Sequence, residues 1–146
     1  MPIIRSKYQS ETTTIEEFYA NEDVGMALVR LGKEMLKLIE FINKNFTETE
    51  LFVFTSHYRM CIQDKDSERL EEFVTINASP FLENYHFHYK LPIEKSPWKD
   101  AWITGKAESV EEGLIFLIKS MIGTEKWKSN KELKSLAKKY NIYDKD

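Results

Sequence analysis

The sequence predicts an α+β protein, a two-layer sandwich in which a three- to four-stranded antiparallel sheet carries a long N-terminal helix and C-terminal helices on one face. Three observations predict this class. Apolar residues recur every three or four positions from Val24 to Phe46, and apolar and polar residues alternate in the middle of the chain. Two serine-led capping signals precede apolar stretches near the end.

The composition predicts a single domain over residues 1–146. The chain has 146 residues, of which 42% are hydrophobic and 31% charged, which is typical of a globular protein. Residues 1–13 are polar and lack periodicity, so we expect a flexible arm there. A single cysteine, Cys61, excludes an intramolecular disulfide, and no apolar run is long enough for a leader or a membrane span. A cytoplasmic protein without a membrane partner is therefore expected.

The long helix is predicted over Val24–Phe46 and carries two apolar stripes. The second stripe contains Gly25, Val29, Gly32 and Leu36. A glycine inside a helix costs about 1 kcal/mol relative to alanine, so two of them on one face indicate a close backbone approach. The neighbour is either a second protomer, which would make these four residues a homodimer interface, or another helix of the same chain.

Four strands are predicted, and each has two faces. In the first, the more apolar parity, with Phe52, Phe54, Tyr58, Met60 and Ile62, is expected to face the helices, which leaves His57, Arg59 and Cys61 on the other side. In the third, Tyr85, Phe87 and Tyr89 alternate with His86, His88 and Lys90. The predicted strands are Leu51–Gln63, Leu70–Asn77, Tyr85–Leu91 and Ala101–Lys106.

Short polar signals mark the remaining helices. Thr14 is placed to cap a first turn, Ile15–Ala20. Ser109 with Glu112, and Ser129 with Glu132, have the form of capping boxes, and each precedes an apolar stripe. We therefore expect one helix that ends near Gly123 and a last helix that ends near Tyr140.

The histidines form a candidate metal site. His86 and His88 lie two apart in a strand and point the same way, so His57 or Cys61 from a neighbouring strand could add a third ligand for a divalent metal. The simpler interpretation is that histidines are ordinary residents of the polar face of a sheet. Cys61 with a histidine also has the form of a nucleophile pair, but a lone cysteine is more often a small buried hydrophobe.

Three functions follow from these patterns. We favour a non-catalytic binding or interaction module that acts as a homodimer, because the sequence carries no compact catalytic motif. The alternatives are an enzyme or sensor that uses a metal held by His57, His86 and His88, and a protein that binds an apolar small molecule in an aromatic-lined pocket between sheet and helices. A nucleic-acid partner is not expected, because the basic residues of the C-terminal helix are all lysines interspersed with acids.

Overall fold

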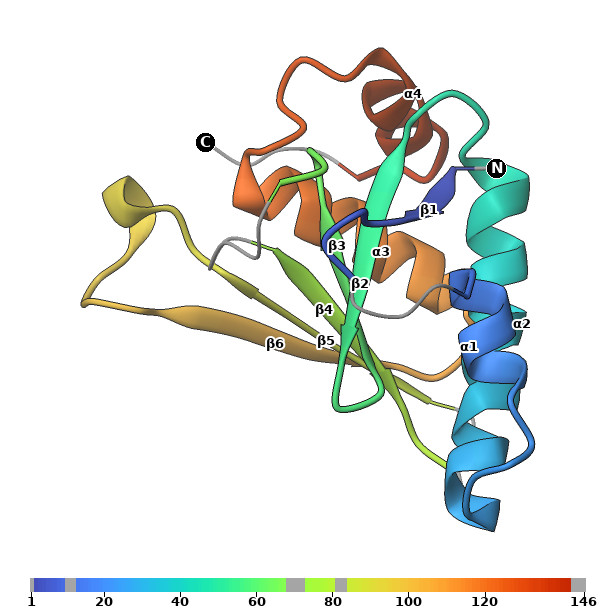
Figure 1. The fold of residues 1–146 in the computed structure, drawn as a ribbon. Coiled ribbons are helices and arrows are strands. Elements are labelled where there is room, and N and C mark those ends of the chain that lie inside the picture. Colours follow the sequence, from blue (N-terminus) through green and yellow to red (C-terminus); the bar gives the residue numbers. More distant parts are fainter. Residues whose placement is uncertain (1, 10–12, 68–72, 81–83, 143–146) are drawn as a thin grey trace.

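The chain forms an α+β structure with a six-stranded sheet and four α-helices. The computed structural model describes residues 2–9, 13–67, 73–80 and 84–142 (Figure 1). In chain order the elements are β1 (Ile3–Arg5), α1 (Ile15–Ala20), α2 (Met26–Asn45), β2 (Leu51–Ser56), β3 (Arg59–Gln63), β4 (Val74–Ala78), β5 (Tyr85–Lys90), the short 3₁₀ helix η1 (Ile93–Lys95), β6 (Trp102–Ala107), α3 (Val110–Thr124) and α4 (Lys131–Lys139).

The sheet is larger than predicted and it is mixed. Its strands lie in chain order from β1 to β6; β1 runs parallel to β2, and every other neighbouring pair is antiparallel. Ile3–Arg5, in the segment expected to be an arm, supply β1, because Ile3 is buried and Ser6 N–H donates to the Val53 carbonyl at 2.8 Å. The start of the predicted second strand, residues 70–72, lies outside the described residues.

The predicted first strand is in fact a hairpin of two strands. His57 and Tyr58 have φ values of 52° and 65°, in the left-handed region that a two-residue turn between antiparallel strands requires. Ser56 therefore pairs directly with Arg59, and both point to the same face. As a result, the residues of β2 that face the helices are the opposite of those expected. Phe54 faces away from the helices, and Val53 faces them.

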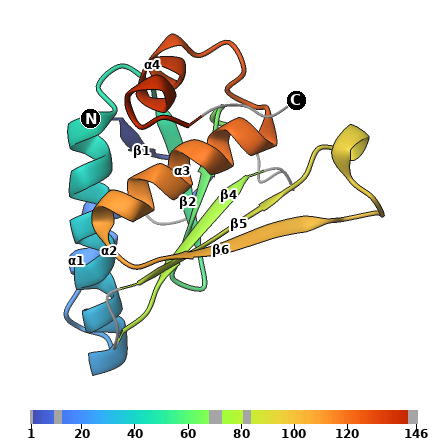
Figure 2. The same ribbon diagram turned by 180° about the vertical axis from the view of Figure 1, so that it is seen from behind.

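The helices cover one face of the sheet. Helix α3 crosses behind the strands in Figure 1 and in front of them in Figure 2, and α2 stands along one side of the same layer. Helix α1 packs on α2, and α4 packs on α3 at one end. The core lies between these layers and includes Met35, Leu38, Ile42, Met60, Ile62, Ile76, Leu114 and Ile118, all fully buried.

The glycine stripe of α2 receives another part of the same chain. Gly32 is buried, and a methyl group added there would overlap the main-chain carbonyl of Tyr19 in α1. The Tyr19 hydroxyl donates to the Tyr58 carbonyl at 3.0 Å. Burial, with smaller effects of Cys61 and Tyr58, raises the pKa of this phenol. Gly25, in contrast, is the exposed N-cap of α2, with open space around it.

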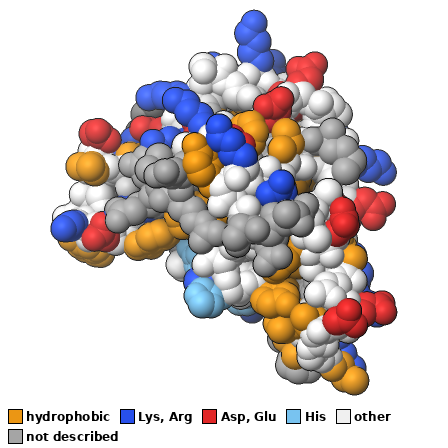
Figure 3. Space-filling model, viewed as in Figure 1, with side chains coloured by type: hydrophobic (Ala, Val, Ile, Leu, Met, Phe, Trp, Pro, Cys, Tyr) orange, Lys and Arg blue, Asp and Glu red, His pale blue; other side chains and the backbone are white. Residues whose placement is uncertain are grey.

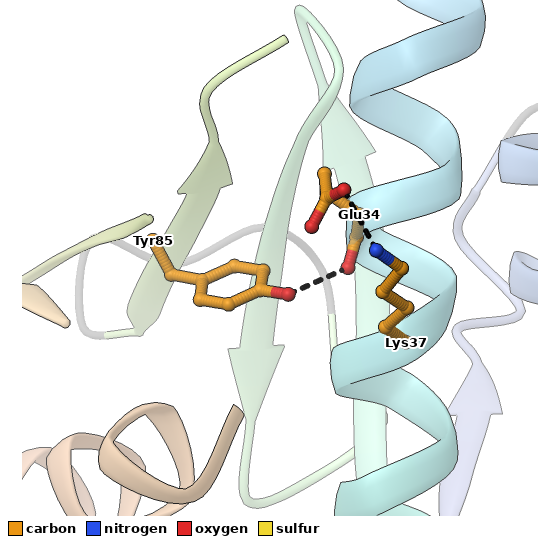
Figure 4. A network of polar contacts seen from close by, with 3 residues as sticks. All are labelled: Glu34, Lys37 and Tyr85. Atoms are coloured by element: carbon orange, nitrogen blue, oxygen red, sulfur yellow. Dashed lines mark hydrogen bonds and ion pairs between the residues drawn. The ribbon is translucent and has the colours of Figure 1, made fainter. Parts of the chain in front are cut away.

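A buried tyrosine joins the sheet to α2. Tyr85 of β5 is fully buried, and its hydroxyl donates to the main-chain carbonyl of Glu34 at 3.0 Å (Figure 4). The Glu34 side chain in turn pairs with Lys37 one turn along the helix, at 3.0 Å. These contacts set how far β5 lies from α2.

One carboxylate of helix α4 joins it to the segment between α2 and β2, in addition to the packing of its buried Leu133, Leu136 and Ala137. The helix is capped by Asn130 rather than by Ser129, and Glu132 in its first turn accepts hydrogen bonds of 2.8–3.1 Å from the three N–H groups of residues 47–49. The hydroxyls of Thr47 and Thr49 add bonds of 3.0 and 2.7 Å. Burial alone would raise the pKa of Glu132, but these donors outweigh it and lower the pKa to about 2.

Candidate functional site

The face of the sheet away from the helices, here called the open face, carries a mixture of aromatic, basic and hydroxyl side chains. In the described residues no helix lies over it. Figure 3, which has the same view as Figure 1, shows histidine side chains below the centre of the molecule with hydrophobic side chains to either side. On this face Trp102 is a large hydrophobic side chain that stays exposed, whereas Phe54 and Cys61 are buried.

One row of residues crosses the open face from β2 to β6. Cross-strand partners follow each other in the order Phe54, Cys61, Thr75, His88 and Thr104. Partners in antiparallel strands lie about 5 Å apart at their Cα atoms, so these five side chains form a continuous line. The members on β2, β3 and β4 are buried, at 3%, 3% and 4% exposure, and the members on β5 and β6 are more exposed.

A pocket of about 780 Å³ lies on this row. Its size is within the range of pockets that hold small organic ligands. The buried members of the row form its floor, and residues from the loop before β6 and from the adjoining rows form its sides. It is lined by Phe54, Ser56, Arg59, Cys61, Phe73, Thr75, His88, Lys90, Asp100, Trp102 and Thr104.

Aromatic rings line two sides of this open-face pocket. The rings of Phe54 and Phe73 meet edge to face, with centroids 5.3 Å apart and an interplanar angle of 76°. Trp102 pairs with Lys90 across β5 and β6 and remains 45% exposed. Of these rings, Phe73 and Trp102 reach solvent, and a planar ligand can cover them.

The two basic side chains of the pocket lining, Lys90 and Arg59, differ in whether they have a carboxylate partner. Lys90 Nζ lies 2.6 Å from Asp100 Oδ1, and this hydrogen bond, more than the nearby lysine charges, lowers the pKa of Asp100 against the small opposing effect of burial. The Arg59 side chain makes no hydrogen bond or ion pair with any residue that the structure describes, although it is only partly exposed. Among its described lining residues, the pocket therefore holds one neutralised cation, Lys90, and one cation without such a partner, Arg59.

His88 stands between these groups in its neutral form. Burial is the main cause that lowers its pKa below 6.5, and the positive charge of Arg59 on β3 and of His86 on β5 adds to the effect. Its register partners are Thr75 and Thr104. A neutral imidazole flanked by two hydroxyls can both donate and accept hydrogen bonds at the centre of the pocket.

The three histidines of the predicted metal site lie in different settings. His57 is in the turn of the β2–β3 hairpin and is exposed, whereas His86 and His88 share the open face of β5 as expected. Among the described residues, no three His, Cys, Asp or Glu side chains come together as a metal site would require. The metal set therefore stays a prediction without a convergent arrangement in this part of the chain.

The predicted interface residues do not form one continuous surface. Gly32 is covered by α1 and Leu36 packs against the core, whereas Gly25 is exposed and Val29 partly so. At Gly32 the intrachain alternative accounts for the glycine, with α1 rather than a C-terminal helix as the neighbour. Homodimer formation stays a prediction.

Sequence reasoning located the aromatic residues of the pocket only in part and missed its hydroxyl residues. It places Phe54 on the helix-facing side and counts Trp102 among the aromatic residues of a pocket between sheet and helices, and it gives Thr75 no ligand-binding role. The aromatic pocket expected between sheet and helices stays a prediction; a hollow of about 190 Å³ lies there, and the larger hollow lies on the opposite face. No local signal in the sequence indicates this, because the apolar parity of β2 comes to lie beside Cys61 only through the pairing of Ser56 with Arg59 in the folded chain.

Two further observations concern the class of protein to which this chain could belong. No helix in the described part of the chain combines the length and the apolar character needed to cross a membrane. Comparisons with family models, with curated proteins and with solved structures found no match.

Proposed function

We propose that this protein is a binding module that takes a small organic ligand in the open-face pocket. The observation that carries the proposal is the pocket itself: about 780 Å³ lined by residues from five strands or their adjoining loops, with buried side chains as its floor. A site assembled from the rigid strands of a sheet holds its side chains in place before the ligand arrives, which lowers the entropy cost of binding.

The composition of the lining supports a small organic ligand. Pockets for such ligands are mostly apolar with a few placed polar groups, and here three aromatic rings stand beside one free guanidinium and several hydroxyls. The dimer interface that the sequence suggested is partly filled by α1, so the open face is the better supported site of association.

Binding can be tested with anilinonaphthalene sulfonate, a dye that fluoresces when its rings enter an apolar site. We expect saturable binding of one dye molecule to the folded chain. Thr104→Trp places a bulky ring over the pocket and should abolish the signal. Ile103→Trp adds the same ring one residue away on the opposite face, so it should leave dye binding unchanged.

The two variants also decide where the dye binds. An equal signal in both would place the dye outside the open-face pocket and contradict the proposal, as would the absence of saturable binding to the native chain. Circular dichroism of each variant must match that of the native protein, because partly unfolded chains also bind such dyes.

A further inference from the structure

The open-face pocket has two chemically different ends. Phe54 and Phe73 supply a pair of rings at one end, and Arg59 stands beside Ser56 near the hairpin turn at the other; Trp102 lies on β6, at the side of the pocket opposite β2. Residues in a strand advance about 3.4 Å each, so Arg59 lies about 7 Å along β3 from Cys61, the residue that pairs with Phe54. A molecule that spans the pocket would touch both a ring surface and a guanidinium.

The charge available to such a molecule is positive. Among the lining residues that the structure describes, Asp100 is the one carboxylate, and it is held by Lys90 at 2.6 Å. Arg59 has no partner of opposite charge among the described residues, and its planar fork of N–H donors matches a carboxylate in two parallel hydrogen bonds. A partly buried cation without a counterion is costly, and an anionic ligand would offset this cost.

Hydrogen-bond donors near Arg59 fit the same group. His88 lies on β5, two strands away from Arg59 on β3. Thr75, on β4 between them, pairs with Cys61 on one side and with His88 on the other. The hydroxyl of Thr75 and one imidazole N–H of His88 can donate to a ligand oxygen without adding a second full charge. The polar end therefore fits an acid group better than an ammonium group, which would meet Arg59 with like charge.

We infer that the ligand of the open-face pocket is a small aromatic carboxylic acid, with its ring against the Phe54–Phe73 pair and its carboxylate on Arg59. This inference rests on the proposed function, because it specifies the chemistry of the same pocket. It adds that the acid group, and not the ring alone, determines which molecules bind.

Naphthylacetate and naphthylacetamide test the inference as a matched pair, because they share ring and length and differ in charge. Titration calorimetry on the full chain should show that the acid binds about tenfold or more tightly than the amide, the usual size of one charge-assisted pair. Arg59→Gln should reduce acid binding to the level of the amide and leave the amide unchanged. Arg59→Lys, which keeps the charge and loses the fork, should fall between the two.

Lys106→Gln is the control for loss of charge. Lys106 lies on the open face outside the pocket, so removing it lowers the net charge by the same amount and should change the acid's affinity less than threefold. Equal binding of acid and amide, both abolished by Thr104→Trp, would overturn the inference and leave the proposed function intact. An acid preference that survives Arg59→Gln would overturn it as well.

Failure of the proposed function would look different. If neither compound bound at millimolar concentration, or if both bound equally well to Thr104→Trp, the pocket itself would be refuted together with the inference. The urea midpoint of each variant, compared with the native chain, separates loss of binding from loss of folding. Arg59 is partly exposed and Lys106 is exposed, so we expect these midpoints to stay close to that of the native chain.

Discussion

Replacing Glu132 with glutamine should destabilise the fold, because it removes the carboxylate that accepts hydrogen bonds from the segment between α2 and β2. In the native chain its two oxygens receive three main-chain N–H groups and two hydroxyls at 2.7–3.1 Å. Glutamine keeps one carbonyl oxygen, but its NH₂ group would face N–H donors. At least one donor then loses its partner.

The size of the effect follows from the pKa of Glu132, which the fold lowers from 4.5 to about 2. A difference of this size corresponds to at most about 3 kcal/mol of stability. Glu132 is partly exposed, and solvent screening reduces the expected loss to about 1–2 kcal/mol. Because the folded-state pKa is depressed, this stability is present above about pH 4.5 and is lost as the pH falls toward 2.

Urea unfolding followed by circular dichroism measures the loss directly. At pH 7 the midpoint of Glu132→Gln should lie clearly below that of the native chain, and the two should converge as the pH falls from 4.5 toward 2. Glu111→Gln is the matched control: it removes an exposed glutamate from the first turn of α3, and no main-chain N–H group of the described residues donates to its side chain. Equal midpoints for the two variants at pH 7 would refute the reasoning.

Two further predictions concern α2 and the pocket. Gly32→Ala should lower the free energy of unfolding by about 1–2 kcal/mol, because the new methyl group overlaps the Tyr19 carbonyl, whereas Gly25→Ala, in open space, should stay within about 0.5 kcal/mol in the same urea assay. The affinity for naphthylacetate should rise as the pH falls below about 6.5, because a bound anion favours protonation of His88, whose pKa is lowered in the free protein. Calorimetry at pH 7.5 and 5.5 checks this; the rise should vanish in His88→Gln and persist in His86→Gln, and a rise that persists in His88→Gln would contradict the assignment.

The helices and the third strand could be predicted because their signals are local. The stripe from Leu31 to Ile42 and the alternation from Tyr85 to Lys90 each repeat with the period of one element, and the structure has a helix and a strand there. The Ser109 cap is also present, and its hydroxyl accepts from Glu112 N–H at 3.1 Å.

The β2–β3 hairpin could not be predicted because its turn lacks the usual residues. Two-residue turns with positive φ favour asparagine or glycine, and here His57 and Tyr58 adopt those angles, with Tyr58 receiving the Tyr19 hydroxyl on its carbonyl. Long-range packing thus stabilises a turn that the local sequence does not indicate. Because this turn was not predicted, the two faces of β2 were assigned the wrong way round, and Phe54 was not recognised as part of the floor of the pocket.

The N-terminal strand was missed because its partner is remote. Three residues are too few for a periodic signal, and Ile3 is recognisable as part of a sheet only once Leu51 lies beside it. The same applies to Glu132, whose donors come from residues 47–49. Contacts of this kind depend on the assembled fold.

The pairing of β1 with β2 has a consequence for the order of folding. Five strands join their neighbours in the sequence, so each ladder among them closes only a short loop, whereas β1 must wait until α1 and α2 have brought Ile3 back to Leu51. Closing such a loop costs about 3–4 kcal/mol of chain entropy, and the pairing of three residues barely offsets this cost. We therefore expect the meander of β2 to β6 to form the folding nucleus and β1 to dock last, an order that pulsed hydrogen-exchange labelling during refolding would record.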